Sequence, residues 1–185
     1  MKYFIDTEFC ENPGTIDLIS IGIVSEDKRE YYALNRGCNI RKACRNSWLE
    51  DNVFLPIYTE YIHGDRRNHK PCSLSTLKEI FRKHGKFFTE ISQDILNFVG
   101  EDKNPEFYGY YADYDWVVFC WIFGRMIDLP EHFPMYCKDL KQMMDDRELN
   151  KEWKQLNCPD PEGEHNALVD ARWNYKLYQA IINQK

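Results

Sequence analysis

The sequence predicts an α/β fold with a mixed five-stranded sheet flanked by helices, and three observations support this prediction. Three strand-like segments follow one another within the first 34 residues, which is typical of an antiparallel three-stranded meander. Beyond them, short strands alternate with helix-like segments, which is typical of parallel strands added to a sheet. In segment 167–182 the apolar residues form a helical stripe, so we expect this helix to pack on the sheet.

The expected strands are short, and turn-forming residues separate the first three of them. Asn12-Pro13-Gly14 and the charged segment 26–28 favour turns. The expected strands are 3–5, 16–24, 30–34, 106–110 and 135–137.

Helical spacing and capping residues predict six helices. Ser73 or Ser75 suits the cap of a helix that begins near residue 74, and Ile91, Ile95 and Val99 lie at helical spacing. The other expected helices are 42–50, 88–99, 114–126, 140–147 and 167–182. The polar segment 57–71, with a basic centre at 63–70, is expected to be a mobile surface loop.

Composition limits the classes of protein to consider. The chain has 185 residues, 43% of them hydrophobic, which suits a single domain over 1–185. No apolar run is long enough to span a bilayer, so we expect a soluble, cytoplasmic protein. Seven scattered cysteines without a C-x-x-C pair argue against a disulfide framework or a zinc ribbon. The net charge of −6 argues against a protein that holds long duplexes, although a nuclease with a cation-binding acidic site remains compatible with it.

The first acidic motif is Asp6-Thr7-Glu8, at the end of an apolar strand. Because strand side chains alternate, Asp6 and Glu8 face the same way. Adjacent carboxylates repel each other unless a cation lies between them, and Mg²⁺ or Mn²⁺ prefers such oxygen ligands. Solvated acids at a strand end are the ordinary alternative, so this motif is weak evidence by itself.

The second motif contains Asp113 and Asp115, between a buried strand and an apolar helix. Either acid suits a helix cap or first turn without any catalytic role. Asp115 lies in line with Val118, Phe119 and Ile122, a stripe that should face the core. An unpaired carboxylate there would be costly without a metal or a donor, so Asp115 is the preferred candidate and Asp113 the alternative.

The third motif contains His165 and Asp170. If Asn166 caps the last helix, Asp170 lies one turn into it and His165 lies on the preceding loop. Five residues of helix would turn His165 and Asp170 apart, so the loop placement allows both to reach one site. A histidine suits a general base that deprotonates water. A surface histidine and a capping aspartate are the alternative.

In order and spacing, the three motifs together resemble those of the DEDDh exonucleases, which include RNase T, oligoribonuclease and proofreading subunits. Phe-Ile-Asp-Thr-Glu-Phe, Tyr-Ala-Asp-Tyr-Asp-Trp and Gly-Glu-His-Asn-Ala-Leu further resemble the compact single-domain 3′-5′ exoribonuclease branch of bacteria and phages. This resemblance implies an RNase H-like fold with two Mg²⁺ or Mn²⁺ ions about 3.5–4 Å apart. It implies that the ions are bridged by Asp6 and also held by Glu8, Asp115 and Asp170.

The resemblance also implies a 3′-5′ exonuclease that releases nucleoside 5′-monophosphates, with His165 as general base. Single-stranded RNA 3′ ends or 3′ overhangs are the expected substrates by resemblance alone, with DNA as the alternative and a homodimer as a reasonable assembly. Phe9 is a candidate to stack on the terminal base, or else a core residue. The candidate phosphate contacts, or else an ordinary solvated face, are Arg66, Arg67 and Lys70.

Two other classes of function remain open. Haloacid-dehalogenase-like phosphatases also begin with an aspartate at the end of the first strand, but they need a second aspartate where this chain has Glu8. A nucleic-acid-binding module with weak catalysis is the non-enzymatic alternative. Hydrolysis of p-nitrophenyl phosphate would favour the phosphatase, and binding without Mn²⁺-stimulated degradation would favour the module.

Overall fold

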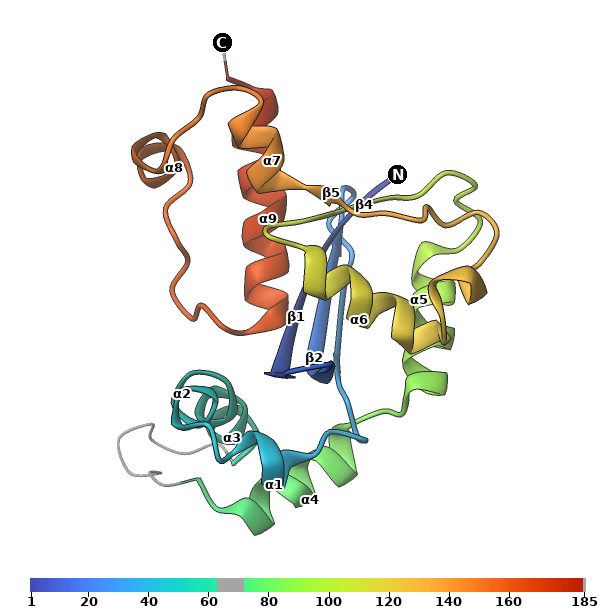
Figure 1. Cartoon of the computed structure of the whole chain (residues 1–185), viewed down its shortest axis with the longest axis vertical. Coiled ribbons are helices and arrows are strands. Elements are labelled where there is room, and N and C mark those ends of the chain that lie inside the picture. Colours follow the sequence, from blue (N-terminus) through green and yellow to red (C-terminus); the bar gives the residue numbers. More distant parts are fainter. Residues whose placement is uncertain (63–71, 185) are drawn as a thin grey trace.

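A five-stranded mixed sheet lies at the centre of the molecule, with helices on both faces (Figure 1). The computed structural model describes residues 1–62 and 72–184, and its strand order is β3-β2-β1-β4-β5. The antiparallel meander consists of β1 (Lys2–Asn12), β2 (Thr15–Ser25) and β3 (Glu30–Leu34), and the parallel strands are β4 (Glu106–Gly109) and β5 (Lys138–Asp139). This architecture confirms the predicted fold class and is consistent with an RNase H-like fold.

Helices cover both faces of the sheet. α9 (Ala167–Ile182) packs along β1 and β2 on one face, whereas α5 (Phe88–Val99) and α6 (Asp113–Phe123) cover the other (Figure 1). The remaining helical segments are α1 (Ile40–Ala43), α2 (Ser47–Leu49), the π-helical turn η1 (Glu50–Phe54), α3 (Leu55–Ile62), α4 (Leu74–His84), the 3-10 turn η3 (Met126–Asp128), α7 (Leu140–Asp145) and α8 (Lys151–Asn157). None of the helices described is long and apolar enough to cross a membrane.

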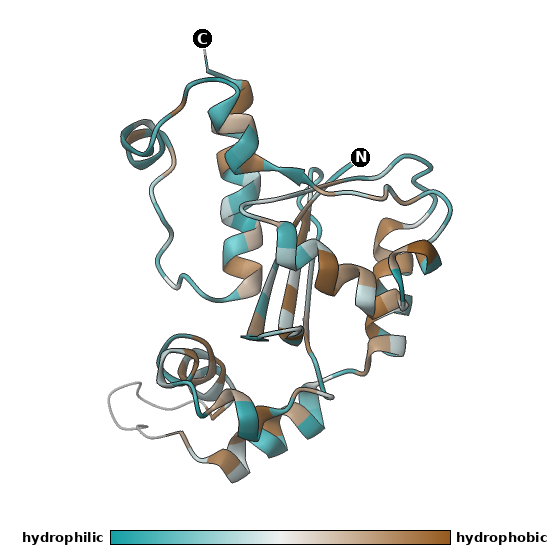
Figure 2. Ribbon diagram, viewed as in Figure 1, coloured by the Kyte–Doolittle hydropathy of each residue, from teal (hydrophilic) through white to brown (hydrophobic). Residues whose placement is uncertain are grey.

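Alternate side chains of β1 contribute to different parts of the core. Tyr3 and Ile5 pack with residues of α5 and α6, whereas Phe4 packs with residues of α7 and α9. In a further buried cluster, the helices α1, α2, α3 and α4 pack against the sheet. In Figure 2 hydrophilic and hydrophobic residues alternate along α9, and both Arg172 and Lys176 of this helix are exposed. Because side chains alternate, Asp6 and Glu8 continue the face on which Phe4 and α9 lie.

Several elements match the sequence prediction closely, although β1 continues to Asn12 where only strand 3–5 was predicted. β3, α5 and α9 have the predicted bounds, and α4 begins after Ser73, whose hydroxyl accepts a hydrogen bond from the Thr76 backbone N–H at 3.4 Å. The predicted helix 114–126 is shorter and ends at Phe123, because Gly124 leaves the helical region with a φ of +122°.

The predictions before residue 72 are partly wrong. Asn39 and Asn46 cap two separate short helices, so the expected helix 42–50 is broken. The expected loop 57–71 is helical in α3 up to Ile62, because Ile57 is buried against α4 and its neighbours. The rest of that expected loop, with its basic centre, lies outside the described residues.

The predicted strand 135–137 is also wrong. Parallel pairing with β4 occurs instead at Lys138 and Asp139, and Met135 and Tyr136 are exposed. The sequence analysis did not predict α8, whose N-terminus is capped by Asn150 through a 2.9 Å hydrogen bond from the Trp153 N–H. Its seven residues are too few for a periodic pattern to identify a helix.

Candidate active site

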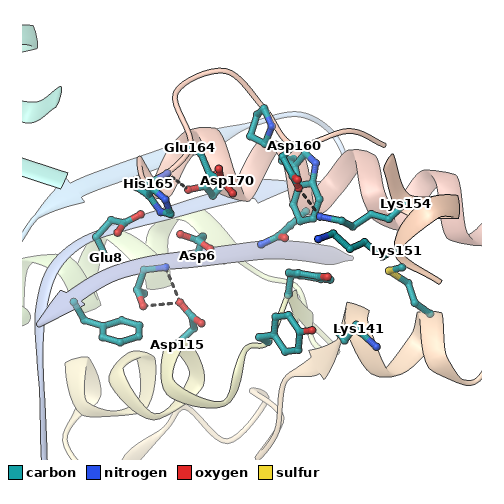
Figure 3. A pocket seen from close by; sticks show the side chains of 18 of the residues that line it. Asp6, Glu8, Asp115, Lys141, Lys151, Lys154, Asp160, Glu164, His165 and Asp170 are labelled. Atoms are coloured by element: carbon teal, nitrogen blue, oxygen red, sulfur yellow. Dashed lines mark hydrogen bonds and ion pairs between the residues drawn. The ribbon is translucent and has the colours of Figure 1, made fainter. Parts of the chain in front are cut away.

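A pocket of about 980 Å³ lies beside the second half of β1 and the amino-terminal ends of α6 and α9 (Figure 3). Its lining includes the five residues selected from the sequence as catalytic, which come from three distant parts of the chain. These residues are Asp6, Glu8, Asp115, His165 and Asp170. The fold therefore brings the three sequence motifs to one site.

Strand alternation places Asp6 and Glu8 on one side of β1. Both carboxyl groups point toward α9 in Figure 3, as expected from their spacing. A bulge follows immediately, because β2 pairs Ser20 with Glu8 and then Leu18 with Phe9. The two carboxylates therefore lie on one side of β1 just before the pairing register shifts.

Asp115 reaches the site along an edge of β1 that β4 leaves open. The parallel pairing of β1 and β4 ends at Phe4 and Tyr108, so the edge of β1 beyond this point is available. There the carboxylate of Asp115 accepts hydrogen bonds from the backbone N–H of Thr7 at 2.7 Å and from its hydroxyl at 2.6 Å. Asp113 is exposed and does not line the pocket. Of the two acids in this motif, Asp115 is thus the one that faces the site.

The loop before α9 holds His165 beside Asp170. Asn166 caps α9 by accepting hydrogen bonds from the N–H groups of Leu168 and Val169, as predicted. His165 has a φ of +69°, and its backbone N–H donates to the Asp170 carboxylate at 2.8 Å. This conformation, unfavourable for a residue with a Cβ, lets the histidine turn back toward the acid from outside the helix.

Gly22 allows α9 to approach the sheet opposite Asp6. It pairs with Asp6 across the β1–β2 ladder, and a Cβ atom on it would lie 2.2 Å from the carbonyl oxygen of Ala167. The first turn of α9 therefore contacts the strand backbone directly. One turn beyond Asp170, the buried Asn174 side chain donates to the carbonyl oxygen of Ile5 at 2.8 Å. These contacts position Asp170 against the acidic pair of β1.

The four carboxyl groups all have raised pKa values. Burial is the largest cause for each group. The charges of Asp115, Glu8 and Asp170 raise the pKa of Asp6 further, to well above its usual range. The pKa of Glu8 is raised to about 8, and those of Asp115 and Asp170 to about 6, partly offset by their hydrogen bonds. The pocket thus disfavours its own negative charges unless positive charge enters it.

The donor set of the pocket fits a divalent cation. Ligand atoms of Glu8, His165 and Asp170 all lie within 4.8 Å of one another, so one ion can contact all three. Mg²⁺ and Mn²⁺ prefer carboxylate oxygens, and imidazole is also a common ligand of transition metals. Asp6 and Asp115 line the same pocket just outside this tightest group.

Of the four candidate substrate contacts, Phe9 lies within the described residues. Phe9 is half-buried, lines the pocket and packs edge-on against Tyr114, with ring centroids 5.9 Å apart. Arg66, Arg67 and Lys70 lie outside the described residues.

Other residues of the pocket wall were not predicted from the sequence. Trp48 of α2 contacts the His165 ring edge-on, with ring centroids 4.6 Å apart. Further lining residues include Tyr110, Tyr111, Lys141, Lys151, Lys154 and Asn174. Isolated lysines and aromatic residues have no distinctive spacing in the sequence, and only the fold brings them to the acidic motifs. The adjacent tyrosines next to the second motif were the one local feature that could have suggested a stacking surface.

Comparisons with known proteins identify the family of this chain. The family model of the Rv2179c-like 3′-5′ exoribonuclease domain matches residues 73–182. Two curated relatives from Mycobacterium tuberculosis are the 3′-5′ exoribonuclease Rv2179c of strain H37Rv and the 3′-5′ exoribonuclease MT2234.1 of strain CDC 1551. Each is 33% identical over 183 residues, which cover 99% of this chain and 94% of the relative. The chain therefore belongs to the family of Rv2179c-like 3′-5′ exoribonuclease domains.

Proposed function

We propose that this enzyme is a metal-dependent 3′-5′ exoribonuclease of the DEDDh type, formed by one domain over residues 1–185. The observation that supports it best is the meeting of Asp6, Glu8, Asp115, His165 and Asp170 in one pocket. The relatives are named 3′-5′ exoribonucleases, which supports RNA as the substrate and the 3′ end as the point of attack.

The acidic part of the pocket would hold the cations that the reaction needs. Asp6, Glu8, Asp115 and Asp170 offer carboxylate oxygens in a site where their charges are destabilised. Two Mg²⁺ or Mn²⁺ ions would supply Lewis-acid stabilisation of the negative charge that develops on the phosphate. In their absence these carboxylates would repel the phosphodiester.

In this proposal, His165 accepts the proton of the attacking water. The water oxygen bonds to phosphorus, its proton passes to the imidazole, and the bond from phosphorus to the 3′ oxygen of the shortened strand breaks. The departing 3′ oxygen takes a proton from solvent, and the product is a nucleoside 5′-monophosphate. The backbone hydrogen bond to Asp170 and the ring contact with Trp48 orient the histidine.

In this proposal, two aromatic side chains hold the terminal nucleotide. Phe9 and Trp48 both line the pocket; Phe9 follows Glu8 in the sequence, and Trp48 contacts the His165 ring. Stacking on a base tolerates every base, as removal of successive nucleotides requires.

Trimming of matched oligonucleotides tests this function. RNA, DNA and RNA–DNA duplexes carrying a 5′ label are incubated with Mg²⁺, with Mn²⁺ or with a chelator. We expect a ladder of RNA products shortened from the 3′ end with either metal and none with the chelator. Asp170→Asn should abolish the ladder, whereas Asp146→Asn, at an exposed aspartate outside the pocket, should leave it unchanged.

The same assay separates the alternatives. Faster trimming of DNA than of RNA would indicate a DNA-directed exonuclease. RNA binding without metal-stimulated shortening would indicate a binding module, and hydrolysis of p-nitrophenyl phosphate in place of RNA would indicate a phosphatase.

A further inference from the structure

The pocket extends past the acidic residues into a part that is basic and aromatic. Figure 3 shows Lys141, Lys151 and Lys154 at the end of the pocket away from Glu8. Lys141 belongs to α7 and the other two lysines to α8, neither of which contributes a residue to the acidic site. One continuous pocket thus has an acidic end and a basic end.

The three lysines differ in how far their charges are already neutralised. Lys154 is buried, forms an ion pair with Asp160, and lies 5.0 Å from the ring centre of Trp173. Its contacts are those of a residue that anchors α8. Lys141 forms an ion pair with Asp145 on its own helix. Lys151 is exposed and makes no ion pair with any residue in the described part of the chain.

Tyr111 exposes an aromatic ring in the same pocket. It has a φ of +55°, a conformation that is unfavourable for a bulky residue and is often found at functional sites. The side chain is 64% exposed, although it lies in the pocket wall. The ring of Tyr110 supports it edge-on, with centroids 4.6 Å apart. An exposed and supported ring of this kind is suited to stacking on a nucleobase.

The chemistry of a 3′ end decides which nucleotide can use this part of the pocket. The terminal nucleotide ends in a free hydroxyl, so every phosphate other than the scissile one lies on its 5′ side. A second phosphate contact must therefore belong to the strand that remains after cleavage. Lysine ammonium groups are suited to such a contact, because they neutralise phosphate charge without reading the base.

We propose that Tyr111, Lys141 and Lys151 form a subsite for the nucleotide on the 5′ side of the scissile phosphate. Tyr111 stacks on the base of this nucleotide, and the two lysines bind the next phosphate. The subsite rests on the proposed nuclease function and extends it. The subsite favours single-stranded RNA, because a base that is paired and stacked in a duplex is not available to Tyr111. It also favours RNA with at least two phosphodiester linkages, because the lysines bind the second one.

A neutral linkage tests the phosphate contact. In a short RNA, a methylphosphonate replaces the second linkage from the 3′ end, so that the scissile linkage stays natural. We expect the replacement to lower kcat/KM of the wild-type enzyme about tenfold, mainly through KM, which is the effect of one charged hydrogen bond. The double variant Lys141→Ala/Lys151→Ala should show a similar loss on natural RNA and no further loss on the modified RNA.

Matched variants separate the subsite from general effects. Lys103→Ala, at an exposed lysine outside the pocket, should behave as wild type on both substrates. Tyr111→Phe should keep the wild-type KM, whereas Tyr111→Ala should raise it about tenfold, as expected for loss of one stacking contact.

Two results would overturn the subsite. The lysines do not bind this phosphate if the double variant trims natural RNA with the wild-type kcat/KM and its kcat/KM falls as much as that of wild type on the methylphosphonate RNA. If wild type fails to shorten natural RNA, the nuclease function fails and the subsite with it. The natural substrate therefore distinguishes the two failures.

Discussion

His165 combines an unfavourable backbone conformation with two contacts that fix its position. Its φ of +69° directs its N–H toward the Asp170 carboxylate, and its ring contacts Trp48. Strain of this kind costs about 1–3 kcal/mol and persists only where surrounding contacts enforce it. At His165 this backbone conformation keeps the imidazole next to the acidic cluster, although the residue lies on the loop before α9.

Replacing His165 tests its role as general base. His165→Ala should keep the fold and the binding of cations by the carboxylates while lowering kcat roughly 10²- to 10⁴-fold, because proton transfer to a positioned base contributes about that much. Steady-state kinetics on RNA measure the effect, and His132→Ala, at an exposed histidine outside the pocket, is the control. Unchanged turnover in His165→Ala would remove this residue from the mechanism.

At the scale of residues, the sequence predicted the contents of the acidic end of the pocket and little of its walls. Chain spacing was enough to select Asp6, Glu8, His165 and Asp170. It favoured Asp115 but kept Asp113 as the alternative, because the helix is apolar nearly all round and the deciding contact is with Thr7, about a hundred residues away. Tertiary contacts of this kind leave no local pattern in the sequence.

The packing of α9 on β2 is the contact between elements on which the site depends most. Gly22 lies under the first turn of α9, where a Cβ atom would overlap the Ala167 backbone. Because this clash is with backbone atoms, no side-chain rotation can relieve it. The helix must move for any larger residue, and it carries Asp170 with it.

Adding one methyl group at this contact should separate α9 from the sheet. Gly22→Ala is expected to lower the free energy of unfolding by about 1–3 kcal/mol, the usual cost of overpacking, and to reduce RNA trimming strongly. Urea unfolding and the trimming assay measure the two effects. Gly37→Ala, where the new Cβ would meet only the Asn35 side chain at 3.3 Å, is the matched control. Wild-type stability and activity in Gly22→Ala would contradict this account of the packing.

Among the helices, length separates the closely matching predictions from the wrong or missing ones. α5 and α9 show apolar spacing over several turns, and their bounds match the prediction. α1, α2 and α8 are four, three and seven residues long, and helices this short depend on capping and tertiary packing. β5 has only two residues, and its position is determined by pairing with β4. The apolar run that begins three residues earlier led to the wrong prediction of strand 135–137.

The fold concentrates unfavourable negative charge beside the middle of its central strand β1. The pKa of Glu8 is raised to about 8 and those of Asp115 and Asp170 to about 6, while that of Asp6 is also well above its usual range. Unfolding returns these groups to about 4. Between pH 4 and pH 8 the folded protein therefore binds more protons than the unfolded chain, and its stability falls as the pH rises.

The stability of the metal-free enzyme should accordingly decrease from pH 5 to pH 8. Carboxylates with lowered pKa values, such as Asp27 at about 2, act below this window and do not oppose the trend. Mn²⁺ at about 100 times its Kd at pH 8 should restore about 2.7 kcal/mol at pH 8, and the same concentration should restore much less at pH 5, where the carboxylates bind protons instead. Thermal unfolding with and without Mn²⁺ measures the difference, and Asp6→Asn should weaken both the pH dependence and the response to the ion. Equal Mn²⁺ stabilisation of wild type and Asp6→Asn would place the cation elsewhere.

The position of the cations is the most direct test of the nuclease mechanism. A crystal of the enzyme grown with Mn²⁺, measured at a wavelength where manganese scatters anomalously, locates the ions without reference to activity. We expect two anomalous peaks in the pocket, together in contact with carboxylate oxygens of Asp6, Glu8, Asp115 and Asp170. Anomalous peaks elsewhere, or an empty pocket at saturating Mn²⁺, would contradict the proposal.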